Sequence, residues 1–174
     1  MRGSRPTSEK WLSREDKVCQ KDRLGRLDWL AEQLPTKEHL TFHGGLMSKF
    51  LYEEARYSFV YGQFLAAIVL GLAFIEHTLA ALFYAAGRND MERPSIAALF
   101  REALNLGLIS QAEFDGLERA RRIRNPVTHF RRPLQEDTVD YRAAVDNELP
   151  YDLIEEDARH VMKTVMHLLA KQTI

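Results

Sequence analysis

Six arginines and one histidine fall within fourteen residues, Arg119–Arg132, which read Arg-Ala-Arg-Arg-Ile-Arg-Asn-Pro-Val-Thr-His-Phe-Arg-Arg. The guanidinium group binds phosphate through a planar fork of N–H donors, and imidazole gains or loses a proton near neutral pH. This combination favours chemistry on a phosphodiester. The segment contains no acid, whereas the whole chain has a net charge of −1, so positive potential is concentrated locally. The simpler alternative is a solvated basic helix face.

The segment is expected to divide at an Asn-Pro pair. A capping box at Ser110-Gln-Ala-Glu113 begins a helix that carries Arg119, Arg121 and Arg122. Pro126 lacks an amide hydrogen and disfavours helical geometry at Asn125, so we expect the helix to end near Arg124. Asn125 would then cap a new turn. Because residues five apart on a continuous helix diverge by about 140°, such a kink would let Arg124 and His129 converge.

Length and composition indicate one soluble domain with a substantial core. The chain has 174 residues, of which 45% are hydrophobic and 28% charged. A single cysteine, Cys19, excludes an intramolecular disulfide and fits a reducing compartment. The first residues are polar and show no signal peptide, and a cytoplasmic location is expected.

Hydrophobic periodicity predicts an all-α fold, an antiparallel bundle of about five helices preceded by an N-terminal helical arm. The arm comprises residues 1–45: a helix from Ser13 until Pro35 stops it, then a loop to Gly45. It would pack on the body or on a second copy. Residues 46–174 form the bundle, with helices expected at 47–61, 63–86, 95–106, 110–124 and 152–171. The intervening stretch 131–150 is predicted to be irregular.

The helix at 63–86 is the most apolar part of the chain and carries Glu76 near its middle. Its apolar stretches, 63–75 and 79–86, together approach the ~20 residues that cross a bilayer. Glu76, His77 and the lack of a basic flanking loop favour a central helix of a soluble bundle, without a membrane. We expect Glu76 to pair with Arg121 or Arg124, or to lie at the bundle edge.

The motifs of common enzyme classes are missing from the sequence. There is no glycine-rich phosphate loop, nucleophile elbow or kinase signature. The six histidines form no helical metal-binding pair with an acid, so neither a metal nor another cofactor is expected.

The hexapeptide Arg124-Asn-Pro-Val-Thr-His129 resembles the Arg-x4-His motif of HEPN domains (higher eukaryotes and prokaryotes nucleotide-binding). The order of elements over residues 46–172 also resembles this family. It consists of a long apolar helix bearing Glu76, a capped helix that leads into the motif, and a final amphipathic helix. The first 45 residues fall outside the resemblance.

The resemblance implies a metal-independent endoribonuclease, of the kind found among toxins and antiviral effectors, that dimerises so that two motifs face one cleft. His129 would then move protons between the ribose 2′-hydroxyl and the leaving 5′-oxygen. Arg124 would stabilise charge on the phosphorane, and Asn125 would orient the phosphate or the histidine. The chemistry agrees, since imidazole has an unperturbed pKa near ~6.5 and arginine donors stabilise phosphate charge. The remaining arginines, which we expect to bind RNA, are Arg119, Arg121, Arg122, Arg131 and Arg132.

The same family contains non-catalytic binding and interaction modules, so an RNA- or nucleotide-binding protein that does not cut is the alternative. Some members work with an antitoxin, including a nucleotidyltransferase that modifies a tyrosine two residues after the histidine. Arg131 occupies that position here, which argues against this mode of control. A homodimer acting on RNA is the expected assembly, and an antitoxin or nucleotidyltransferase partner stays open.

Overall fold

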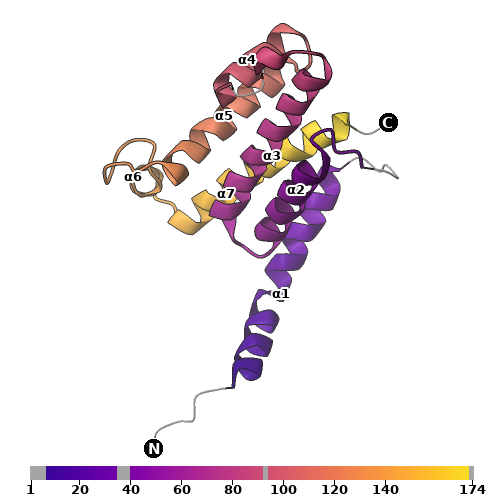
Figure 1. The fold of residues 1–174 in the computed structure, drawn as a ribbon. Coiled ribbons are helices and arrows are strands. Elements are labelled where there is room, and N and C mark those ends of the chain that lie inside the picture. The colour runs from indigo at the N-terminus through magenta and orange to yellow at the C-terminus, as the bar shows by residue number, and fades with distance from the viewer. Residues whose placement is uncertain (1–6, 35–39, 92–93, 173–174) are drawn as a thin grey trace, which may run out of the picture.

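The computed structural model describes residues 7–34, 40–91 and 94–172, and within them the fold is all-α (Figure 1). These residues form seven α-helices and one 3-10 helix, Asn89–Met91, and no strand. The α-helices are α1 (Ser8–Gln33), α2 (Gly45–Val60), α3 (Phe64–Ala85), α4 (Ile96–Asn105), α5 (Gln111–Thr128), α6 (Val139–Asp146) and α7 (Pro150–Lys171). In the described part, six α-helices follow the arm rather than about five, and the additional one is α6.

Helix α3 lies at the centre of the bundle and packs against α2, α4, α5 and α7. Its buried side chains include Phe74, Ile75 and Leu79, which belong to the same hydrophobic core as Val165 and Met166 of α7. Among the described residues, α3 is the one helix long and apolar enough to cross a membrane. Ten of its 22 residues are buried in the bundle.

Helix α1 begins five residues earlier than the capping pattern at Ser13 predicts. Thr7 caps it, and its hydroxyl accepts from the amide of Lys10 at 3.4 Å. The first half of α1 projects away from the bundle (Figure 1), where Trp11 and Val18 are exposed. Of the predicted loop after α1, residues 35–39 lie outside the described residues, and Leu40–Gly44 are not helical.

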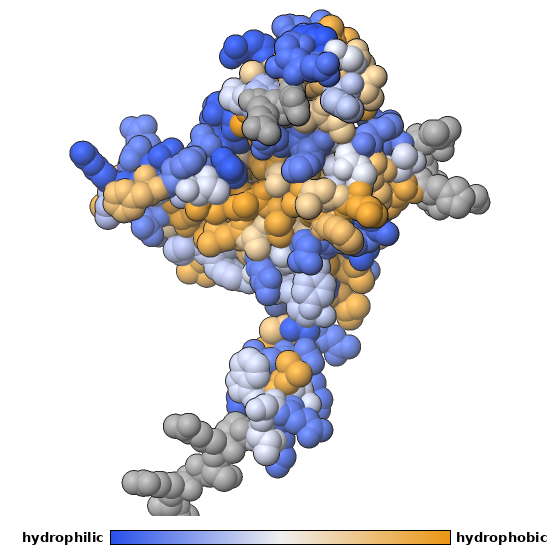
Figure 2. All heavy atoms as spheres, in the orientation of Figure 1, coloured by the Kyte–Doolittle hydropathy of each residue, from blue (hydrophilic) through white to orange (hydrophobic). Residues whose placement is uncertain are grey.

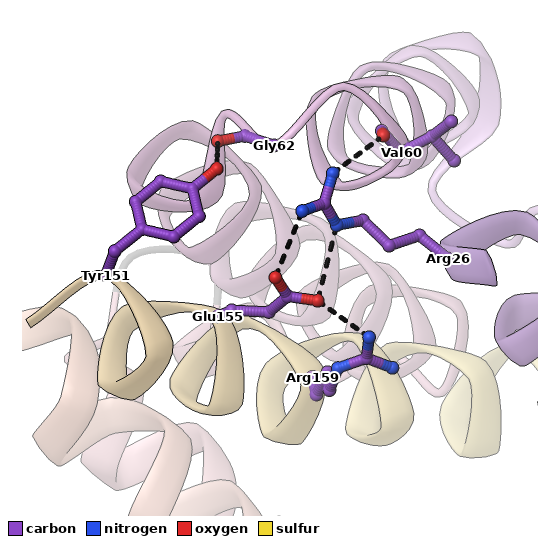
Figure 3. Close-up of polar contacts among 6 residues, drawn as sticks. All are labelled: Arg26, Val60, Gly62, Tyr151, Glu155 and Arg159. Atoms are coloured by element: carbon purple, nitrogen blue, oxygen red, sulfur yellow. Dashed lines mark hydrogen bonds and ion pairs between the residues drawn. The ribbon is translucent and has the colours of Figure 1, made fainter. Parts of the chain in front are cut away.

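The second half of α1 is fastened to the bundle by Arg26 (Figure 3). Its guanidinium donates to both carboxylate oxygens of Glu155 in α7, at 3.0 and 3.3 Å, and to the carbonyl of Val60 at 3.4 Å. Glu155 also accepts from Arg159 at 2.6 Å. Leu30, one turn after Arg26 on α1, is buried and belongs to the main core.

Helix α6 corrects the expectation that residues 131–150 are irregular. Thr138 caps its start, with the hydroxyl accepting from the amide of Tyr141 at 3.3 Å, and Asn147 ends it in the left-handed conformation at φ 55°. None of its eight residues is buried, and a helix of this length is too short for hydrophobic periodicity to reveal it.

Gly71 allows α3 and α7 to approach closely, and replacing it by alanine tests this packing. A Cβ at Gly71 would lie 2.8 Å from Val161 Cγ1 and 3.3 Å from Val165 Cγ2. Gly71→Ala is therefore expected to lower the free energy of unfolding by about 1–3 kcal/mol. Gly116→Ala is the matched control, because its nearest neighbour is Thr164 Oγ1 at 4.0 Å and alanine favours helix. Urea denaturation should show the first variant less stable than the second, and the reverse order would contradict this packing.

Candidate functional site

Helix α5 carries the arginine-rich segment, and a capping box starts it as the sequence predicts. The Ser110 amide donates to Glu113 Oε2 at 2.7 Å, and the Glu113 amide donates to Ser110 Oγ at 3.3 Å. Burial alone would raise the pKa of Glu113, but hydrogen bonds from Lys171 and Ser110 outweigh it and lower that pKa.

The expected helix break at Asn125-Pro126 is wrong. Helix α5 continues through Pro126 to Thr128, and the amide of His129 donates to the carbonyl of Asn125 at 3.0 Å. The Thr128 hydroxyl donates to the carbonyl of Arg124 at 3.2 Å, so this end of the helix gains a side-chain hydrogen bond. Because Pro126 lies in the last turn, its missing amide costs one helical hydrogen bond and the helix does not divide.

The three proposed reacting residues, Arg124, Asn125 and His129, lie at the C-terminal end of α5. Arg124 and Asn125 are half-buried on the helix, and His129 is the exposed C-cap residue with extended backbone at φ −127° and ψ 133°. Without a break, no kink turns Arg124 towards His129 within one chain. Arg124 has no ion pair among the described residues, so its guanidinium charge is not neutralised by a neighbour.

Glu76 does not pair with Arg121 or Arg124, which corrects that part of the expectation. Glu76 is half-buried on α3 and has no ion pair in the described part of the chain. Arg121 instead donates to both carboxylate oxygens of Glu118, one turn earlier on the same helix, with the shortest contact at 2.8 Å. This hydrogen bonding lowers the pKa of Glu118.

The other four arginines expected to bind RNA differ in how freely they can do so. Arg122 and Arg132 are exposed and have no ion pair within the described ranges. Arg119 is exposed and lies 3.8 Å from a Glu156 carboxylate oxygen. Arg131 Nε donates to Asp137 Oδ2 at 2.7 Å. Arg122 and Arg132 therefore have the most available positive charge.

A pocket of about 550 Å³ opens between α3, α5, α6 and α7 beside this segment, and we call it the arginine pocket. It is lined by Leu65, Ile68, Arg119, Arg122, Ile123, Pro126, Val127, Phe130, Arg131, Asp137, Thr138, Val139, Asp140, Arg142, Ile154 and Asp157. Three of the predicted RNA-binding arginines line it. Arg124, Asn125 and His129 do not line it. In the sequence, however, His129 lies between Val127 and Phe130, which both do.

Sequence reasoning missed the outer wall of this pocket, which α6 provides. Arg142 of α6 donates twice to Asp157 of α7, at 2.6 and 3.1 Å, and Asp157 is buried. One sequence feature could have revealed α6. Thr138 followed by an acid at Asp140 is typical of a helix start. Nothing in the sequence indicated which carboxylate Arg142 would reach.

A second pocket of about 410 Å³ lies between α5 and α7 and includes His160. Burial lowers the pKa of His160, which favours the neutral ring. Its Nε2 lies 2.9 Å from the carbonyl of Gly116, and in the neutral ring this nitrogen donates to the carbonyl. The histidine therefore joins α5 to α7. In the described part of the chain, no group of three or more His, Cys, Asp or Glu side chains is arranged to hold a metal ion.

The basic end of α5 and the arginine pocket thus form the candidate functional site. Comparison of the chain with protein-family models, with curated proteins and with solved structures finds no match in any of the three.

Proposed function

We propose that this protein is a metal-independent endoribonuclease of HEPN type that acts as a homodimer. The observation that carries the proposal is the contrast among the arginines of α5. Arg121 is neutralised by Glu118, whereas Arg122 and Arg124 form no ion pair in the described part, and the exposed His129 is the C-cap residue of the same helix. Guanidinium groups that form no ion pair and an accessible imidazole are the groups that RNA cleavage requires.

The proposed reaction uses the ribose 2′-hydroxyl as the nucleophile. One His129 removes the proton of that hydroxyl, whose oxygen attacks phosphorus, and the bond from phosphorus to the 5′-oxygen breaks. His129 of the second protomer gives a proton to the leaving oxygen. The products are a 2′,3′-cyclic phosphate and a 5′-hydroxyl. Arg124 stabilises charge on the phosphorane, and Asn125 orients the phosphate or the histidine.

The dimer is supported by an apolar face of α3 that the chain itself leaves partly uncovered. Leu65 is exposed, and Ala66, Val69, Ala73 and Ala80 are half-buried on this helix, with the half-buried Glu76 and the exposed His77 on the same face. Figure 2 shows apolar residues gathered across the middle of the bundle, in the region where Figure 1 shows α3. Such a face is typical of a surface that another protein covers. A second copy there would supply the second histidine.

Incubation of the protein with labelled RNA in EDTA tests the proposal. Wild type is expected to cleave RNA, and not DNA of the same sequence, to products ending in a 2′,3′-cyclic phosphate. His129→Ala should lower the rate by about 100-fold or more, because it removes both proton transfers.

His167→Ala is the control, since His167 is an exposed histidine of α7. Light scattering should give twice the 20.1 kDa chain mass. Cleavage by His129→Ala at the wild-type rate, or a strict monomer that cleaves, would contradict the proposal.

The second candidate is a non-catalytic module that holds RNA or a nucleotide. The arginine pocket favours it, because this pocket is lined by Arg119, Arg122 and Arg131 but not by His129. This candidate predicts binding that weakens with salt and with Arg122→Ala, and no cleavage.

A further inference from the structure

The arginine pocket combines an apolar floor, unpaired cations and acidic acceptors in one cavity. The floor comes from three helices, with Ile68 of α3, Ile123 and Val127 of α5, and Ile154 of α7. A volume of about 550 Å³ lies within the range of sites for small molecules. The flat face of an aromatic ring fits against these apolar side chains.

The cations lie on the α5 side of the pocket. Arg122 forms no ion pair in the described part, although its charge helps to lower the pKa of Glu118, and Arg119 has only the 3.8 Å contact with Glu156. Arg142 and Arg131 are hydrogen-bonded to Asp157 and Asp137 and so contribute little net charge. Arg122 and Arg119 are therefore positioned to bind one phosphate group.

The acceptors lie at the start of α6. Asp140 is exposed, has no ion pair within the described ranges and lines the pocket. Asp137 Oδ2 accepts from Arg131, whereas its Oδ1 is buried with no hydrogen-bond partner. These carboxylates would repel a simple polyanion. They favour a ligand whose flat ring brings N–H donors while its phosphate reaches the arginines.

We infer that the arginine pocket binds the base of one unstacked nucleotide, and guanine in preference to the others. Guanine presents two adjacent N–H donors on one edge, which match the two oxygens of the Asp140 carboxylate. Adenine and cytosine present one amino group, and uracil presents a single ring N–H. The phosphate lies against Arg122 and Arg119, and Phe130, which is 88% exposed at the rim, can stack on a neighbouring base.

This inference rests on the proposed function only in taking the nucleotide to be part of RNA. The pocket selects the base, and Arg124 and His129 act on the phosphodiester. His129 directly precedes Phe130 of the pocket rim, so a strand bound there passes close to the histidine.

Titration calorimetry of the full chain with 5′-GMP and 5′-UMP tests the inference, because mononucleotides contain no bond that the protein could cut. GMP is expected to bind about tenfold more tightly than UMP. Asp140→Asn should remove most of that preference. Arg122→Ala should weaken both nucleotides about tenfold and leave guanosine, which lacks the phosphate, unchanged.

Arg56→Ala and Glu136→Gln are matched controls, since both residues are exposed and neither lines the pocket. Circular dichroism of each variant confirms that it is folded. Absence of mononucleotide binding, equal affinity for GMP and UMP, or an unchanged preference in Asp140→Asn would overturn the inference, whether or not RNA is cleaved. Binding with the expected preference and no RNA cleavage would support it and overturn the endoribonuclease.

Discussion

Glu155→Ala is expected to lower the free energy of unfolding by about 3 kcal/mol, because it leaves the Arg26 guanidinium without its carboxylate. The Arg26 side chain is 9% exposed and that of Glu155 is 20% exposed, so water cannot fully replace the lost partner. The same carboxylate accepts from Arg159, whose guanidinium lies over the rings of Trp29 and Phe59. Urea denaturation followed by tryptophan fluorescence measures the loss.

Glu156→Ala is the matched control, because the next residue of α7 is exposed and has only the 3.8 Å contact with Arg119. It should change the stability by less than about 0.5 kcal/mol. Equal losses in the two variants would show that the ion pairs of Glu155 do not fasten α1.

The effect of Glu155 should also depend on pH. Burial tends to raise the pKa of Glu155, but hydrogen bonds from Arg26 and Arg159 outweigh it and hold the pKa below the ordinary value of 4.5. A carboxylate whose pKa is lowered by folding stabilises the fold above its unfolded pKa, and this contribution is lost as the pH falls through the folded value. The difference between wild type and Glu155→Ala should therefore be complete near pH 7 and shrink below pH 4.5.

The helices that were predicted correctly are those whose caps and apolar patterns lie within short stretches of the sequence. The capping box at Ser110 and Glu113 and the cap at Ser95 are contacts over three residues, so the side chains needed to recognise them are adjacent in the sequence. The apolar run of α3 and the stripe of α7 likewise reveal buried helices through their own composition. The all-α fold follows from these features.

The parts that were not predictable depend on residues far apart in the sequence or on a balance of small energies. Arg26 meets Glu155 across 129 residues, and no local pattern selects that carboxylate. At Pro126 the local rule favoured a break, but one lost hydrogen bond in the last turn did not divide α5. The arginine pocket was missed because one side of it is formed by α6, an eight-residue helix with no buried residue that is too short for a periodicity analysis.

Arg142→Met is the second variant from which we expect a large effect, because α6 has little else to hold it in place. A helix of eight residues is marginal in water by itself. The two hydrogen bonds from Arg142 to Asp157 join it to α7, and removing them leaves a buried carboxylate without a partner. We expect a loss of about 2–3 kcal/mol and faster hydrogen exchange over residues 139–146, measured by mass spectrometry.

Two comparisons separate the unpaired charge from the loss of a side chain. Arg122→Met removes an arginine of the same pocket that has no ion pair in the described part, so its stability should stay within about 0.5 kcal/mol of wild type. The double variant Arg142→Met with Asp157→Leu replaces the pair by apolar side chains and should recover most of the lost stability. If the double variant were as unstable as Arg142→Met, the buried charge would not be the cause. Protection of α6 unchanged in Arg142→Met would show that the wall of the arginine pocket is held by other contacts.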